Sequence, residues 1–137
     1  MYKRQGRAHG LPTEWSETKS IDWKTPITGR AWSTPVIMGE QVWVSNATPD
    51  GKKMFAVCLD KATGQKLHDL LLFENADPEP LSNHINCYGS CPPAIDADHV
   101  YLHFASYATA ALDPKTGAEI YRKQRLPGST GFTASPW

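Results

Sequence analysis

Ala56-Val57-Cys58-Leu59-Asp60-Lys61-Ala62-Thr63-Gly64-Gln65-Lys66-Leu67-His68 contains a turn that the chain repeats as Ala110-Ala111-Leu112-Asp113-Pro114-Lys115-Thr116-Gly117-Ala118-Glu119-Ile120-Tyr121. Each copy is an apolar strand, the sequence Leu-Asp-x-x-Thr-Gly and a second strand. This pattern predicts a tight hairpin, because the aspartate accepts backbone N–H groups, the threonine adds a weaker bond and the glycine supplies a positive φ. The predicted structural turn residues are Asp60, Thr63 and Gly64, and again Asp113, Thr116 and Gly117.

The residues before each turn repeat as well. Pro35 and Pro93 are each followed seven residues later by a valine, Val42 and Val100, that opens an alternating run. Pro136 begins a third copy, so the prolines are 58 and 43 residues apart. A repeat of about 40–50 residues with four short strands in each unit is typical of β-propeller blades rather than of helical repeats. The sequence therefore predicts an all-β fold of four-stranded antiparallel sheets, as an incomplete β-propeller.

The strand positions follow from apolar alternation and from turn residues. In a first blade at about residues 31–73, we expect the strands Ser33–Met38, Gln41–Asn46, Met54–Asp60 and Lys66–Phe73. In a second blade at about 88–123, we expect Ser90–Ile95, Val100–Ser106, Ala108–Asp113 and Ala118–Lys123. A third blade would begin at residues 133–137. The repeats would occupy residues 20–137, after an N-terminal loop segment at residues 1–19.

Two further segments are interpreted by their place beside the blades. Ser20–Lys24 alternates between apolar and polar residues, and we expect it to be an outer strand that joins the last blade of a complete ring. Glu74–Asn86 carries prolines and acidic residues without periodicity, which predicts a long loop between the blades.

These residues resemble the bacterial β-propeller proteins built from pyrroloquinoline-quinone-type (PQQ-like) repeats. Their unit runs Ser-x-Pro, strand, strand, Ala-x-Asp-x-x-Thr-Gly-x-x-x-Trp. The segments at residues 11–15, 21–26 and 101–107 are similar to the N-terminal part of one subgroup of this family. The resemblance implies an N-terminal fragment of about two blades. It also implies a periplasmic or exported protein, although residues 1–10 lack the apolar segment of a signal peptide.

Two departures from the family pattern affect these expectations. His68 and Tyr121 stand where the family has its docking tryptophan, four residues after the turn glycine, which weakens the stacking between blades. The adjacent cysteine pair and the calcium-binding acidic residues of quinone-dependent dehydrogenases are not recognisable. The resemblance to PQQ-like repeats therefore does not imply the quinone, and no cofactor is predicted.

The charge balance and the composition exclude several kinds of partner. The chain has 14 basic and 14 acidic residues, whereas a nucleic-acid-binding protein needs a clustered basic face. No apolar run approaches the ~20 residues of a membrane span. The 11 prolines and 10 glycines indicate many turns. Two blades leave open strand edges, so we expect pairing with the remaining blades or self-association.

Few residues carry a chemical signal. Cys58 is interpreted as a core thiol. Cys87 and Cys91 form either two thiols or a small disulfide, and thiols are favoured because an extended chain would separate the two Cα atoms too far. Asp96-Ala97-Asp98 is interpreted as a turn. The five histidines, His9, His68, His84, His99 and His103, show no metal-ligand spacing, so neither catalytic nor metal-binding residues are predicted.

A candidate ligand site comes from the repeat alignment. Arg30 and Tyr88 each precede their blade's proline by five residues and, with Trp32 and Asn86, would lie on the ring face before the innermost strand. A guanidinium, an amide and two aromatic rings suit a polar or sugar-like ligand. The alternative is that Trp32 and Tyr88 only fill the space between blades. In that case the loop Glu74–Ser82 is the next candidate.

The function predicted from these observations is a non-catalytic PQQ-like β-propeller repeat module. It would act as a binding or assembly scaffold for a protein or glycan partner. Two alternatives stay open, namely part of a quinoprotein-type oxidoreductase and part of a carbohydrate-active propeller enzyme. Both would have their catalytic residues outside this chain. A fold of this kind hosts enzymes and binding proteins alike, so the fold alone does not decide between them.

Overall fold

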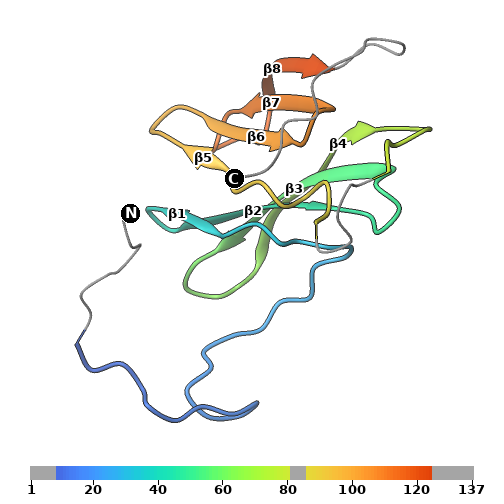
Figure 1. Ribbon diagram of the computed structural model, residues 1–137. Helices are drawn as coiled ribbons and strands as arrows, with labels where there is room; N and C mark the ends of the chain where they lie inside the picture. Colours follow the sequence, from blue (N-terminus) through green and yellow to red (C-terminus); the bar gives the residue numbers. More distant parts are fainter. Residues whose placement is uncertain (1–8, 81–85, 125–137) are drawn as a thin grey trace, which may run out of the picture.

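The computed structural model describes residues 9–80 and 86–124, and within them the chain forms two four-stranded antiparallel sheets without a helix (Figure 1). The first sheet has the strand order β1-β2-β3-β4 and the second β5-β6-β7-β8. The strands are β1 (Val36–Met38), β2 (Gln41–Ala47), β3 (Lys53–Asp60), β4 (Lys66–Glu74), β5 (Ala94–Ile95), β6 (Val100–Phe104), β7 (Ala108–Leu112) and β8 (Glu119–Gln124). The predicted all-β fold class is confirmed, whereas the predicted start of a third blade lies outside the described residues.

Each observed strand overlaps a predicted one, and the main differences are at the ends. β5 begins only at Ala94, because Pro92 and Pro93 have no N–H group to donate to a sheet. β6 ends at Phe104, because Ala105 takes a left-handed conformation with a φ of 49°. Ser33 lies before β1 and instead donates its hydroxyl to the Ser45 carbonyl at 3.1 Å.

The two sheets share one hydrophobic core. Val100, Leu102 and Phe104 form the buried row that the sequence predicts for β6, each with no exposed surface. They pack against Trp43 and other side chains from the first sheet. Phe104 meets Phe73 of β4 edge to face, with ring centroids 5.8 Å apart. The second sheet therefore covers one face of the first (Figure 1).

The other face of the first sheet is covered by the N-terminal segment, residues 21–27. Trp23 and Ile27 pack on Val42, Val57 and Leu59, which form a second and smaller apolar cluster. Residues 20–24 do not belong to a strand in the structure, although an outer strand was expected there. Both faces of the first sheet are thus covered, which explains why every residue from Val42 to Ala47 is buried.

The first Leu-Asp-x-x-Thr-Gly turn is closed by its own side chains. Asp60 Oδ1 accepts the backbone N–H and the hydroxyl of Thr63, both at 2.7 Å. Gly64 has a φ of 72° and donates its N–H to the Asp60 carbonyl at 2.8 Å. A glycine takes this left-handed conformation without the strain that a Cβ atom would cause.

The second turn has the same construction. Asp113 Oδ1 accepts the backbone N–H groups of Lys115 at 2.7 Å and of Thr116 at 3.3 Å. Gly117 has a φ of 71° and donates its N–H to the Asp113 carbonyl at 2.9 Å. A shift in strand register precedes both turns, between Cys58 and Leu59 and between Ala111 and Leu112. The repetition therefore extends from the side chains to the backbone.

We predict that Gly64→Ala destabilises the protein more than Gly39→Ala. Both glycines have a positive φ, so alanine introduces backbone strain of about 1–2 kcal/mol at either position. A Cβ atom at Gly64 would also lie 2.5 Å from carbons of the Trp23 ring, whereas one at Gly39 would meet no atom within 4 Å. Denaturant unfolding should show a loss about 1–3 kcal/mol larger for Gly64→Ala. Equal losses would contradict the packing of Trp23 on this turn.

We predict that the two turn aspartates contribute to loss of stability in acid. Bonds from the Thr63 hydroxyl and N–H lower the pKa of Asp60 from its ordinary value of 3.8, and backbone N–H groups of Lys115 and Thr116 lower the pKa of Asp113. A lowered folded-state pKa stabilises the protein above pH 3.8, and this contribution is lost as the pH falls through the folded-state pKa.

The measurement is the melting temperature from pH 7 to pH 2 for the wild type and for Asp60→Asn/Asp113→Asn. The double variant should melt lower at pH 7 and lose less stability between about pH 4 and pH 2. Some acid dependence should remain, because hydrogen bonds also lower the pKa of Asp50 and of Asp96. If the melting temperature of the double variant falls with pH as steeply as that of the wild type, the turn carboxylates do not cause the loss of stability in acid.

Candidate functional site

The two sheets meet at the second repeated turn. The imidazole of His68, on β4, stacks on the Trp43 indole with centroids 5.6 Å apart and an interplanar angle of 23°. The same imidazole lies against the turn glycine, since a Cβ atom at Gly117 would be 3.0 Å from His68 Nδ1. We call Gly117 with the neighbouring carbonyl of Pro114 the second turn surface. An aromatic ring from the first sheet therefore covers the bare backbone of a turn in the second.

The first repeated turn carries an equivalent contact. Trp23 covers Gly64, and its indole Nε1 donates to the Lys61 carbonyl at 2.9 Å. Thr25 adds a bond from its hydroxyl to the Gly64 carbonyl at 2.5 Å. We call Gly64 with the carbonyls of Lys61 and Gly64 the first turn surface. The N-terminal segment thus makes the same kind of contact with the first sheet that β4 makes with the second.

A glutamine supplies the donor at the second turn surface. Lys61 and Pro114 occupy the same position of the repeat, directly after the aspartate. The Pro114 carbonyl accepts the side-chain amide of Gln41 at 2.8 Å, and the Gln41 oxygen in turn accepts Trp43 Nε1 at 3.1 Å. The histidine therefore does not remove the contact between the sheets, because Gln41 makes the bond that an indole makes at the first turn.

Tyr121 lies four residues after Gly117, as His68 lies four residues after Gly64. Its side chain is 52% exposed, and the neighbouring Ile120 is 54% exposed. In the part of the chain that the structure describes, β8 pairs only with β7 and every residue of β8 is exposed. Trp23 and His68 thus each cover a turn surface, whereas Tyr121 lies on an exposed face of the second sheet.

The four predicted ligand-binding residues lie around one junction between the sheets. The backbone of Arg30 pairs with Ala47 at the end of β2, and its carbonyl accepts the thiol of Cys87 at 3.6 Å. Gly89 passes so close that a Cβ atom there would be 2.9 Å from the Arg30 carbonyl oxygen. The two segments that lead into β1 and β5 are therefore neighbours, as the repeat alignment implies.

The side chains at this junction differ in exposure. The side chain of Trp32 is 59% exposed and that of Arg30 is also exposed, whereas Asn86 is half-buried. Tyr88 is only 4% exposed, and its ring packs against Gly51. The ligand-binding role of these residues stays a prediction.

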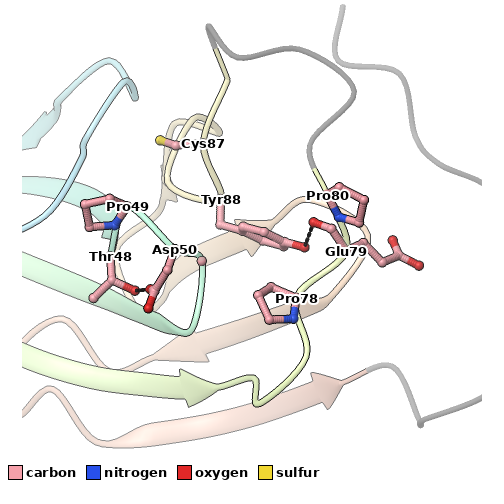
Figure 2. Close-up of a pocket in the computed structure, with 9 residues that line it drawn as sticks. Thr48, Pro49, Asp50, Pro78, Glu79, Pro80, Cys87 and Tyr88 are labelled. Carbon is pink, nitrogen blue, oxygen red and sulfur yellow. Dashed lines mark hydrogen bonds between the residues drawn. The ribbon is translucent and has the colours of Figure 1, made fainter.

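Tyr88 forms one wall of a cavity of about 220 Å³ between the β2–β3 turn and the loop after β4 (Figure 2). Its ring lies against Gly51, and its hydroxyl donates to the Glu79 carbonyl at 3.0 Å. The other lining residues come from both loops, namely Thr48, Pro49, Asp50, Pro78, Pro80 and Cys87. The cavity is smaller than the ~300–1,000 Å³ of sites for drug-sized ligands.

The carboxylates at this cavity do not converge on its centre. Figure 2 shows Asp50 turned toward Thr48 and the Glu79 carboxylate directed away from the Tyr88 ring. Asp50 accepts the Thr48 hydroxyl at 2.5 Å, and Glu79 accepts the Ser106 hydroxyl at 3.1 Å. A binding or catalytic pocket needs polar groups that point inward, so this arrangement serves to hold the loops together.

The cysteines show no reactive arrangement. All three are free thiols in the structure. Burial raises the pKa of the Cys58 thiol to about 11, which keeps it protonated at neutral pH. The expected extended chain between Cys87 and Cys91 is wrong, because Ser90 donates its N–H to the Cys87 carbonyl at 3.1 Å and closes a turn. Gly89 permits this turn next to the backbone of Asn46.

The residues that the structure describes contain no group of three or more histidine, cysteine, aspartate or glutamate side chains that could hold a metal ion. No helix among them is long and apolar enough to cross a bilayer. In comparisons with known proteins, neither a family model nor a curated protein sequence matches the chain. The resemblance to PQQ-like repeats therefore rests on the residues quoted above.

We predict that His68→Ala destabilises the protein and that Tyr121→Ala, at the same repeat position, does not. The first change removes a ring that contacts both Trp43 and Gly117, for an expected loss of about 1–3 kcal/mol in the free energy of unfolding. The second removes an exposed ring and should stay within about 0.5 kcal/mol. Urea unfolding at low protein concentration measures both. Equal effects would contradict the inter-sheet role of His68.

Proposed function

We propose that this chain is a non-catalytic β-propeller repeat module that acts as a binding and assembly scaffold. The observation that carries the proposal is the contact between an aromatic ring and a turn glycine, made by Trp23 at Gly64 and by His68 at Gly117. The contact of His68 joins the first repeat to the second, and that of Trp23 joins the N-terminal segment to the first repeat. Repeat architectures are stabilised by interfaces of this kind between neighbouring units.

The distribution of polar groups supports a scaffold rather than an enzyme. The carboxylates at the cavity are hydrogen-bonded to Thr48 and Ser106, away from its centre. Asp60, Asp96 and Asp113 accept bonds within their own turns. The pKa of each is lowered by these bonds, which is the opposite of the raised pKa that a general acid needs.

The exposed surface at the junction supports a binding role. Trp32 offers an exposed indole, and Arg30 offers a guanidinium on the same stretch of chain. Aromatic rings and arginine side chains dominate the binding energy of many interfaces, and an indole face also stacks on sugar rings. We therefore propose a protein or a glycan as the partner of this face.

We predict that the purified chain has no catalytic activity of the two alternative kinds. With added pyrroloquinoline quinone and calcium, it should neither oxidise alcohols and aldoses with an electron-accepting dye nor quench its tryptophan fluorescence in a saturable manner. It should also release no reducing sugar from oligosaccharides. If either activity is found and is abolished by replacing one acidic residue, the scaffold function is wrong and the chain is the corresponding enzyme.

The binding face is tested with a panel of soluble oligosaccharides and tryptophan fluorescence. Trp32→Ala should weaken binding of any oligosaccharide that binds by about 10-fold or more, since stacking on one ring contributes strongly. Arg30→Ala and Asn86→Ala should weaken it less. Leu67→Ala, which changes an exposed apolar residue on β4, serves as the control. Unchanged affinity in all three junction variants would move the site to the loop after β4.

A further inference from the structure

The exposed face of β8 is a candidate interaction surface, because its central ring, Tyr121, has a repeat equivalent in His68 that contacts a turn glycine. Tyr121 occupies the repeat position of His68 and, unlike it, has no turn glycine against it among the described residues. Ile120 beside it is also more than half exposed. Two adjacent exposed apolar side chains on an edge strand favour association with another surface.

The first turn surface already accepts a ring from a segment outside the sheets. Trp23 reaches it from the N-terminal segment, whose backbone does not belong to a strand. The segment is held there by two side-chain bonds, from Trp23 and from Thr25, and by the packing of Ile27. Its neighbour Lys24 pairs only with the exposed Glu17, a contact that contributes little.

We infer that the first turn surface is the docking site for β8 of a second copy of this chain, with Tyr121 taking the place of Trp23. The inference rests on the proposed scaffold function and names its partner. The repeat identifies the occupant. Tyr121 lies four residues after Gly117, as His68 lies four residues after Gly64, and the two glycines occupy the same position of their turns. A tyrosine hydroxyl is also a donor for the Lys61 carbonyl, which Trp23 Nε1 now satisfies.

This docking would stack copies head to tail. The surface on one copy differs from the surface on the next, so the contact is heterologous and leads to a closed ring or to an open chain. Trp23 competes as part of the same molecule, at an effective concentration of the order of mM. The wild type therefore associates weakly, and removal of the Trp23 ring strengthens the association.

The first experiment is sedimentation over a range of protein concentrations. Trp23→Ala should lower the dissociation constant of the complex by about 10-fold or more. Trp23→Ala/Tyr121→Ser should return to monomer, whereas Trp23→Ala/Trp15→Ser, which changes an exposed ring outside both sheets, should still associate. Association of both double variants alike would overturn the inference.

The second experiment keeps Trp23 and so does not depend on the folding of that variant. A photoreactive phenylalanine at position 121 should cross-link two copies through the peptide that contains residues 61–65. Cross-links to other peptides only, or none at high concentration, would overturn the docking. If His68→Ala still destabilises the protein in that case, the repeat-module function stands and only the head-to-tail contact is wrong.

Discussion

The contact of an aromatic ring with the bare backbone of a turn glycine is the constraint on which the rest of this structure depends. It requires a left-handed residue without a Cβ atom, and Gly64 and Gly117 provide one at the same place in two turns. The ring in each case comes from the preceding part of the chain. A local hairpin motif thus determines how sheets stack, since the conformation that closes the turn also exposes the surface on which the next element packs.

The histidine at this contact shows how a repeat tolerates substitution. An imidazole is smaller than an indole and leaves the carbonyl after the turn aspartate without the donor that Trp23 supplies at the first turn. Gln41 makes that bond, and Trp43 both orients Gln41 and stacks on His68. The interface therefore depends on three side chains of the first sheet, and a weaker stacking between sheets does not follow from the histidine alone.

The sequence predicts those parts of the fold that depend on neighbours along the chain. The alternation of Val100, Leu102 and Phe104 identifies a buried row, and the aspartate and glycine of each turn identify its bonds. The sequence does not predict that Trp23 covers Gly64, because the pair is separated by most of the first sheet. Likewise, the burial of Tyr88 depends on Gly51 and Pro78, which only the folded chain brings to its ring. The repeat alignment located the junction, but exposure at it depends on these long-range contacts.

The strand order has a consequence for how the chain folds. Every strand pairs with its neighbour in sequence, so each sheet can form from short hairpins before the two sheets meet. Contacts that join the sheets, such as Gln41 to Pro114 and Arg122 to the Leu72 carbonyl, close much longer loops. Loop-closure entropy delays such contacts relative to local ones. We therefore expect two hairpin-built sheets to form early and their docking through His68 to be the late, slower step.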